Sequence, residues 1–116
     1  MKRDFTYIDD IVDGILKLIP APPEDGGVDF APYRIFNIGN NRPEPLMELV
    51  SILEKTLDVK ADLAFLPMQK GDVKETFADI EPLRAAVGYE PKTSLQTGIP
   101  LFIDWYRNFI ERKLRQ

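Results

Sequence analysis

Apolar residues recur at helical spacing in three stretches of this chain, at residues 11–19, 46–57 and 95–110. In each stretch the apolar side chains share one face, and the charged residues lie largely off that face. This pattern predicts three amphipathic helices. A fourth, shorter helix is expected from Asp79, whose side chain can cap a helix start, to about residue 87, because Gly88 is a typical helix stop.

Capping residues and prolines indicate where the three longer helices begin. Asp9 or Asp10 can cap the first helix, and Pro45 suits the first turn of the second. Ser94 can cap the last helix. Pro100 lies inside the apolar pattern of that helix, so the sequence predicts either a kink there or a later start.

Shorter runs with a β-leaning composition fall between the expected helices. Strands are predicted at residues 3–8, 33–38 and 61–65, and a further β-leaning run at residues 76–77. The segment 20–32 carries four prolines and two adjacent glycines, which favours an exposed loop. The expected fold class is therefore α/β, in the form of an α+β-like small lobe whose short strands form a small sheet packed with about four helices.

Composition excludes several classes of chemistry. The 116 residues include no cysteine and no histidine, so disulfides, thiolate zinc sites and imidazole catalysis cannot be built from this sequence. A hydrophobic content of 44% is enough for a core, and no apolar run approaches the roughly 20 residues of a membrane span. A soluble, cytoplasmic protein without a membrane partner is expected.

The charge balance argues against nucleic acid as a partner. The formal net charge is -4, whereas nucleic acids and anionic membranes both attract clustered positive charge. The basic cluster at residues 112–115 is typical of the solvated C-terminal end of a helix, where cations also suit the helix dipole. We therefore expect no nucleic-acid partner.

Two short patterns leave alternatives open. The turn at residues 37–39 resembles a phosphate-binding turn, but it lacks the repeated glycines of a dinucleotide loop, and an ordinary strand-to-helix turn is the alternative. Asp9, Asp10 and Asp13 could ligate a divalent cation. Carboxylates at a helix start also serve as caps and suit the helix dipole, so the cluster has a structural explanation as well.

Arg3 and Asp72 are the residue types that a nucleoside diphosphate requires. A planar guanidinium can bind a diphosphate through two parallel hydrogen bonds, and a carboxylate can accept hydrogen bonds from a vicinal diol. Nothing in their spacing along the sequence shows that the two residues meet. A surface arginine and a turn aspartate are the alternative interpretation.

Four segments in order along the chain resemble one known family. They are RDFTYIDD at residues 3–10, FNIGN at 36–40, GD followed by TFAD at 71–79, and GIPLFIDWY at 98–106. Together they resemble the C-terminal part of the extended short-chain dehydrogenase/reductases, the NAD-dependent epimerase/dehydratase family. The segment LPMQKGDV at 66–73 and the GIP start of the last segment look most like the UDP-glucuronate 4-epimerases within that family.

The resemblance implies a two-lobed protein of which residues 1–116 are the smaller lobe, a single C-terminal nucleotide-sugar-binding domain. In this family an N-terminal Rossmann domain holds NAD, and a Tyr-x-x-x-Lys pair drives the conversion of UDP-glucuronate to UDP-galacturonate through a 4-keto intermediate. The sequence contains neither Gly-x-Gly-x-x-Gly nor Tyr-x-x-x-Lys. We expect the Rossmann domain to be absent, the parent enzyme to use NAD, and this fragment to bind no NAD and to be inactive, with no catalytic residue and no metal site.

The resemblance also implies which residues bind the UDP-sugar substrate. Arg3 matches the family arginine that contacts the diphosphate, and Asp72 matches the carboxylate that binds the ribose hydroxyls. Gln69 stands where some related epimerases have a second arginine, and Lys70 could replace that arginine in part. Thr76 matches a position near the nucleotide.

Partner surfaces are the last expectation from sequence. Phe102, Trp105, Tyr106 and Phe109 share the last helix, and aromatic residues at helical spacing favour a core position over a partner surface. Loss of the Rossmann lobe should expose an apolar patch, so self-association into a homo-oligomer is expected. Two other interpretations stay open: a non-catalytic α/β interaction module, or the same lobe from another nucleotide-sugar 4-epimerase or dehydratase.

Overall fold

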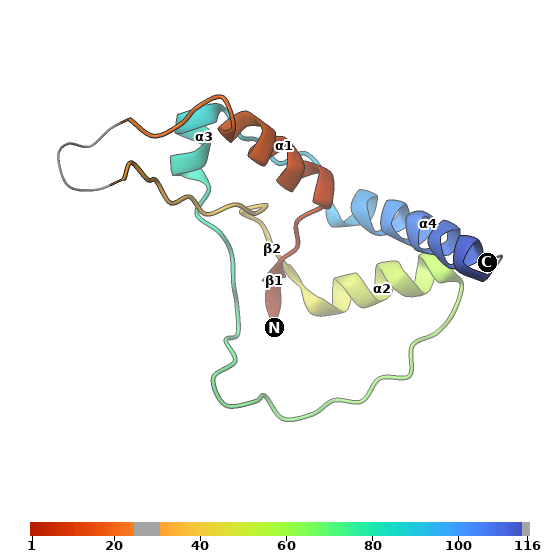
Figure 1. Ribbon diagram of the computed structural model, residues 1–116. Coiled ribbons are helices and arrows are strands. Elements are labelled where there is room, and N and C mark those ends of the chain that lie inside the picture. Colours follow the sequence, from red (N-terminus) through yellow and green to blue (C-terminus); the bar gives the residue numbers. More distant parts are fainter. Residues whose placement is uncertain (25–30, 115–116) are drawn as a thin grey trace.

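The computed structural model describes residues 1–24 and 31–114. Its elements are β1 (Lys2–Asp4), α1 (Ile8–Leu18), β2 (Pro43–Pro45), α2 (Leu46–Leu57), α3 (Glu81–Val87) and α4 (Leu95–Leu114) (Figure 1). Within the described residues there are thus four helices and one two-stranded sheet, which confirms the expected α/β small-lobe fold class. Residues 25–30 of the expected loop and residue 115 of the basic cluster lie outside the described residues.

The first two helices, α1 and α2, begin close to the predicted residues, but their capping differs from the prediction. α1 begins at Ile8, and its N-cap residue, Tyr7, makes no side-chain capping bond. The expected cap by Asp9 or Asp10 is therefore wrong. Pro45 precedes α2 as its N-cap with an extended ψ of 137°, so it stands just before the first turn instead of inside it.

The Gly88 stop of α3 and the Ser94 cap of α4 are confirmed, whereas Asp79 stands one residue before Ile80, the N-cap of α3. Asp79 Oδ1 accepts the Glu81 N–H at 3.1 Å, and Gly88 closes α3 in the left-handed region with φ 66°. Ser94 Oγ accepts the Thr97 N–H at 3.2 Å at the start of α4. α4 continues through Pro100, so the later start considered for this helix is wrong.

The strand predictions succeeded only where the chain provides a partner. β1 pairs antiparallel with β2, and Arg3 stands opposite Glu44. The sheet is short because both ends of β2 are prolines, which have no N–H to donate to the ladder. Segments 33–38 and 61–65, predicted as strands, form none, and the expected strand 3–8 shrinks to three residues. A single parallel bridge joins Lys2 to Glu75, beside the β-leaning run at residues 76–77.

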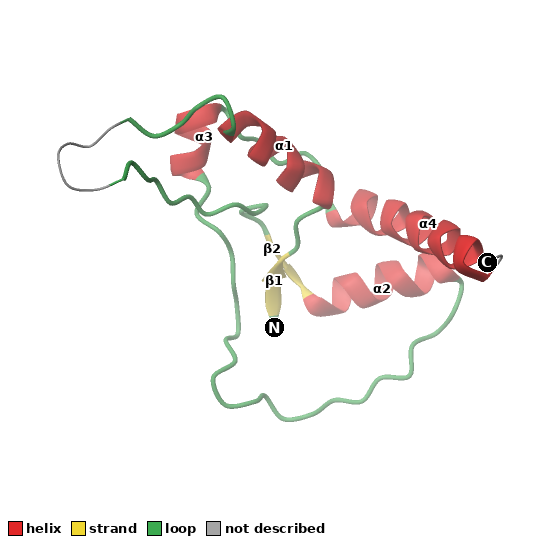
Figure 2. Ribbon diagram, viewed as in Figure 1, coloured by secondary structure: helices red, strands yellow, loops and turns green. Residues whose placement is uncertain are grey.

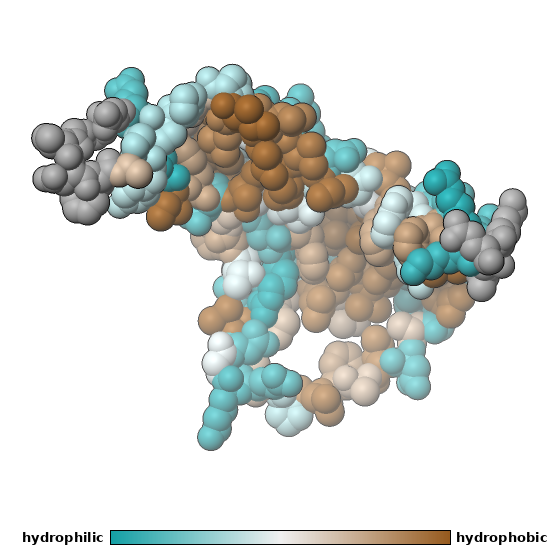
Figure 3. Space-filling model, in the orientation of Figure 1, coloured by the Kyte–Doolittle hydropathy of each residue, from teal (hydrophilic) through white to brown (hydrophobic). Residues whose placement is uncertain are grey.

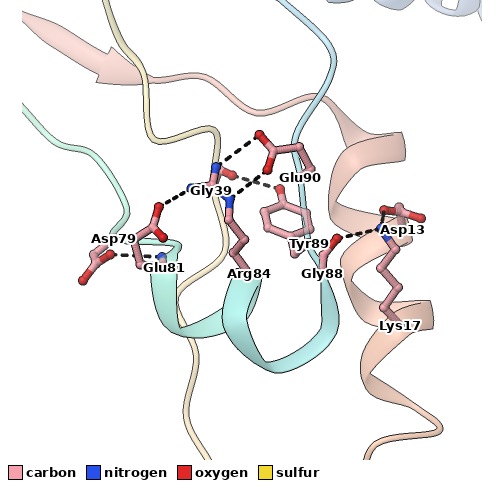
Figure 4. A network of polar contacts seen from close by, with 9 residues as sticks. All are labelled: Asp13, Lys17, Gly39, Asp79, Glu81, Arg84, Gly88, Tyr89 and Glu90. Atoms are coloured by element: carbon pink, nitrogen blue, oxygen red, sulfur yellow. Dashed lines mark hydrogen bonds and ion pairs between the residues drawn. The ribbon is translucent and has the colours of Figure 1, made fainter.

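The core lies between α1, α3 and the segment that follows α3. Ile80, Leu83 and Tyr89 are fully buried there, and Ile38 packs against them from the extended segment. The Tyr89 hydroxyl donates a 2.9 Å hydrogen bond to the Gly39 carbonyl (Figure 4). Two groups of polar contacts lie on the elements around this core. Arg84 pairs with Glu81 and Glu90. Lys17 pairs with Asp13 and donates to the Gly88 carbonyl.

The molecule is open for its length. The Cα radius of gyration is 18.5 Å, whereas a compact domain of this length has about 13 Å. The accessible surface is 9253 Å², about 2,800 Å² more than the scaling law gives for a folded monomer of this mass. Figure 2 shows the two causes, long loops and two separate helix pairs, α1 with α3 and α2 with α4. Much apolar surface therefore lacks a partner within the described residues.

The apolar face predicted for α1 lies largely on the surface instead of in the core. Ile8 and Ile19 mark the ends of an exposed stripe, at 60% and 70% exposure. The space-filling view shows this stripe as one apolar area over α1 (Figure 3). The face of α1 that packs inward carries Asp10, Gly14 and Leu18. We call the exposed set the α1 stripe; it consists of Ile8, Val12, Ile15, Leu16 and Ile19.

The aromatic residues of α4 are also more exposed than the core prediction implied. Trp105 is 57% exposed, and its ring stacks on Phe109 with centroids 5.4 Å apart. Phe102 lies 5.9 Å from Trp105 and 6.3 Å from Tyr106, so the four rings form a ladder along the helix. The core assignment of these residues is therefore wrong, because each of the four keeps 41% or more of its surface exposed.

Candidate nucleotide-binding site

The structure brings Arg3 and Asp72 together, although 69 positions separate them in the sequence. Arg3 Nη2 donates to Asp72 Oδ1 at 2.7 Å, and the two groups form an ion pair. Arg3 Nη1 donates to the carbonyls of Lys2 and Val73, both at 2.9 Å. Three hydrogen bonds thus hold the Arg3 side chain, and the Val73 N–H fixes its partner by donating to the same Asp72 oxygen.

Backbone pairing explains why these side chains meet. The Lys2 N–H donates to the Lys74 carbonyl at 2.8 Å, and the Thr76 N–H donates to the Lys2 carbonyl at 3.4 Å. These bonds lay residues 72–76 along the edge of β1. Since Arg3 follows Lys2 directly, its side chain can reach back to the turn that carries Asp72.

The paired groups keep hydrogen-bonding capacity for a ligand. A guanidinium has five N–H groups, of which Arg3 uses both on Nη1 and one on Nη2. Within residues 1–24 and 31–114, its Nε–H and the second Nη2–H have no acceptor, and Asp72 Oδ2 has no donor. The site therefore presents two N–H donors beside a carboxylate oxygen, at a partly exposed position.

The other predicted substrate-binding residues lie around this pair. Gln69 and Lys70 form the turn before Asp72, in which the Asp72 N–H donates to the Gln69 carbonyl at 3.2 Å. Gly71 has φ 90° in this turn, a conformation that favours glycine. Both side chains are exposed. Thr76 lines a pocket of about 340 Å³ together with Asp4 and Gly39.

Asp4 is the residue that the sequence analysis missed. Its carboxylate accepts four peptide N–H groups, from Asn40, Asn41, Arg42 and Ala78, at 3.0 to 3.2 Å. A carboxylate with several main-chain donors is a strong anchor, because each bond is charge-assisted. No local signal distinguishes Asp4, since its partners lie 36 or more positions away.

These contacts decide between the two interpretations of the turn at residues 37–39. The N–H groups of residues 40–42, which a phosphate would need, all donate to the Asp4 carboxylate. The turn binds an anion, but the anion is a side chain of the chain itself. The phosphate-binding interpretation is therefore wrong, and the turn has a structural role.

The acidic residues of α1 have structural partners too. Asp10 is buried, and its oxygens accept the N–H groups of Lys92 and Thr93 at 3.2 and 2.9 Å. Asp13 forms an ion pair with Lys17 at 2.7 Å, one helical turn away. Among the described residues no three metal-ligating side chains come together. Asp10 thus anchors the segment before α4 instead of capping its own helix.

One finding bears on membranes. None of the helices in the described part of the chain combines the length and the apolar character that crossing a bilayer requires.

Comparison with known proteins places the chain beside nucleotide-sugar enzymes. No protein-family model matches it. It is 40% identical over 122 residues to the protein CapI of Staphylococcus aureus, covering 97% of this chain and 36% of CapI. It is 45% identical over 115 residues to UDP-glucuronate 4-epimerase 1 of Arabidopsis thaliana, covering 94% of this chain and 27% of that enzyme. The chain thus spans about a third of the length of the curated relatives it matches.

A solved structure agrees with these relatives. A mutant UDP-glucuronic acid 4-epimerase from Bacillus cereus, in complex with UDP-4-deoxy-4-fluoro-glucuronic acid and NAD, superposes with a TM-score of 0.73 at 28% identity. The match covers 91% of this chain and 32% of the epimerase. The resemblance to the extended short-chain dehydrogenase/reductases is confirmed, and the chain is a homologue of part of the UDP-glucuronate 4-epimerases.

Proposed function

We propose that this chain is the nucleotide-sugar-binding lobe of an NAD-dependent epimerase that converts UDP-glucuronate to UDP-galacturonate through a 4-keto intermediate. In this proposal residues 1–116 form one C-terminal domain of a larger cytoplasmic enzyme. The observation that supports it most is the contact between Arg3 and Asp72, which places a guanidinium and a carboxylate side by side. The similarity to UDP-glucuronate 4-epimerases supports the choice of substrate.

The geometry of the pair suits the two polar parts of UDP. The two remaining N–H groups of Arg3 can donate to the diphosphate, and Asp72 Oδ2 can accept from a ribose hydroxyl. Ribose and diphosphate are neighbours in UDP, as the two side chains are here. The ion pair also fixes the Arg3 side chain before the ligand arrives, which lowers the entropy cost of binding.

Gln69, Lys70 and Thr76 complete the proposed contact surface. Gln69 and Lys70 extend from the turn that positions Asp72, so they lie where a bound nucleotide would pass. The Lys70 ammonium is a point charge that can approach a phosphate without fixed geometry. Thr76 presents a hydroxyl from the segment that pairs with β1.

The exposed apolar surface supports a second lobe as partner. The helix that carries the α1 stripe lies beside segment 33–38, because Gly14, on the inward face of that helix, packs on the Ile38 side chain. In that segment Tyr33 and Ile35 are 74% and 85% exposed, and it has no strand partner among the described residues. An unpaired extended segment can be paired by a strand of another sheet, and an exposed apolar helix face can be covered by another layer of an α/β protein. We assign this surface to contact with a Rossmann lobe, because the relatives are about three times as long as this chain.

In this proposal the described residues provide no site for NAD. A dinucleotide site needs peptide N–H groups directed at a pyrophosphate, but those of residues 40–42 donate to Asp4. The sequence also lacks Gly-x-Gly-x-x-Gly and Tyr-x-x-x-Lys. In the proposal, NAD and the catalytic groups therefore belong to the other lobe, and this chain alone binds no NAD and turns over no substrate.

Titration with UDP, followed by amide and arginine side-chain NMR, tests the proposal. We expect UDP to shift the resonances of Arg3, Asp72 and the turn between Gln69 and Asp72. The Arg3→Ala substitution should weaken binding by about 2 kcal/mol, roughly 30-fold, because a charge-assisted contact is lost. Arg42→Ala is the matched control, since Arg42 also pairs with a carboxylate, that of Glu44.

A ligand variant separates the roles of the two residues. Asp72→Asn should weaken the binding of UDP more than that of 2′,3′-dideoxy-UDP, because the latter has no ribose diol and senses only the loss of the ion pair with Arg3. Silence of the spectrum at millimolar UDP would contradict nucleotide binding by this chain. That result would favour the alternative of a non-catalytic interaction module.

A further inference from the structure

Asp4 holds the point where three segments of the chain meet, next to Arg3. Its carboxylate joins β1 to the turn at residues 40–42 and to Ala78. We propose that Asp4 is the positioning residue of the nucleotide site: its four peptide contacts fix β1, and β1 in turn fixes the Arg3 guanidinium against Asp72. This inference rests on the proposed function of Arg3 and Asp72.

The sheet alone cannot fix β1. β1 has three residues and pairs with Pro43, Glu44 and Pro45, of which only Glu44 has an N–H to donate. Lys2 adds two backbone bonds to the segment at residues 74–76. The Asp4 carboxylate supplies four further N–H contacts, so it makes the largest set of polar contacts that any β1 side chain makes to other segments.

The packing around the carboxylate leaves it little freedom. A Cβ atom on Gly39 would lie 2.7 Å from Asp4 Oδ2 and 2.6 Å from the Ala78 Cβ atom. Glycine is thus required at position 39 for the carboxylate to approach the backbone of the turn. A side chain confined in this way defines the position of its own Cα atom, and hence that of the preceding residue.

Strand geometry transmits this constraint to Arg3. Neighbouring side chains of a strand point to opposite faces. Asp4 accordingly reaches the turn at residues 40–42, while Arg3 reaches Asp72 and the Val73 carbonyl. Asp4 also holds the segment that carries Thr76, because its carboxylate accepts the N–H of Ala78, two residues beyond Thr76. One carboxylate therefore sets both the donor side and the hydroxyl side of the proposed nucleotide site.

The test compares Asp4→Asn with Asp10→Asn in the full 116-residue chain. Asp10 is the control, because its carboxylate also accepts peptide N–H groups, two compared with the four of Asp4, but lies in a different part of the lobe. The first readout is the resonance of the Arg3 Nη2–H group that donates to Asp72, recorded without ligand. Asp4→Asn should move it toward the position of a solvent-exposed arginine, and Asp10→Asn should leave it in place. An unmoved Arg3 resonance in a folded Asp4→Asn chain would overturn the proposal.

The second readout is a double-mutant cycle on UDP binding. Asp4→Asn should weaken binding about tenfold in the wild-type background and leave it unchanged in the Arg3→Ala background, because Asp4 acts through Arg3. An equal loss in both backgrounds would overturn the positioning role. If the wild-type chain binds no UDP, the proposed function fails, yet the Arg3 resonance still decides the role of Asp4.

Hydrogen exchange of the wild-type chain covers the case in which Asp4→Asn does not fold. The Asn41 and Ala78 amides donate to Asp4, and the Val73 amide donates to Asp72. If the Asp4 contacts hold the site, the three amides should exchange through one opening with a common free energy. Val73 protected more strongly than Asn41 and Ala78 would show that the site stays closed without Asp4, and would overturn the proposal.

Discussion

Tyr89 offers the sharpest test of how this small core is held together. Its ring is fully buried, and its hydroxyl donates to the Gly39 carbonyl at 2.9 Å. Burial raises the pKa of the Tyr89 hydroxyl to about 12, and the nearby charges of Asp10, Asp4 and Asp13 act in the same direction. Replacing Tyr89 by Phe removes both the hydrogen bond and the titration.

The magnitude follows from these two effects. At neutral pH, Tyr89→Phe leaves the buried Gly39 carbonyl without its donor and should cost about 1–2 kcal/mol of unfolding free energy. The folded protein holds the Tyr89 proton more tightly than the unfolded chain, in which the pKa is 10.0. The stabilisation is therefore complete below pH 10 and is lost as the pH rises toward 12. At pH 11 the loss amounts to about 1.4 kcal/mol.

Urea unfolding at pH 8 and pH 11 measures this difference. The wild-type chain should be more stable than Tyr89→Phe at pH 8, and the gap should nearly close at pH 11. Tyr33→Phe is the matched control, because the Tyr33 ring is exposed and its replacement should change neither value. If the gap between wild type and Tyr89→Phe were the same at both pH values, the titration of a buried Tyr89 could not be its cause.

Three further changes test other parts of the structure. Asp10→Asn should lower the unfolding free energy by about 1–2 kcal/mol in urea titrations, because one oxygen that binds the Lys92 or Thr93 N–H becomes an amide donor; no loss would contradict the anchoring role of Asp10. Gly88→Ala should cost about 1 kcal/mol in the same assay, because Gly88 has φ 66°. Ile15→Lys in the α1 stripe should reduce self-association in sedimentation velocity, and an unchanged concentration dependence would exclude this stripe as the contact.

The helices could be predicted because their signals are local. Asp79, Gly88 and Ser94 form bonds at helix ends with partners at most four residues away, so the sequence contains the whole interaction. The exception is Asp10, which has the expected residue type for a cap. Its burial beside Lys92 gives it distant N–H partners, and no local pattern shows this.

Strands failed for the opposite reason. Segment 33–38 has the composition of a strand, but a strand exists only where another chain segment offers N–H and C=O groups. The described part of the chain provides no such partner. The sequence offered Arg3 and Asp72 as candidates without showing that they meet. Their contact depends on the Lys2 pairing with the segment at 74–76, which is equally non-local.

The exposed apolar surface is separate from the contacts that hold Arg3 and Asp4. An excess of about 2,800 Å² over a compact monomer is of the size that permanent interfaces bury, and the α1 stripe accounts for part of it. None of the contacts that hold Arg3 and Asp4 involves that stripe; they connect β1, the turn at 40–42 and the segment at 72–78. The proposed nucleotide site is thus assembled from this chain's own segments and does not depend on the α1 stripe. Self-association through the α1 stripe should therefore leave the Arg3 resonance unchanged, and a titration of chain concentration followed at that resonance measures this independence directly.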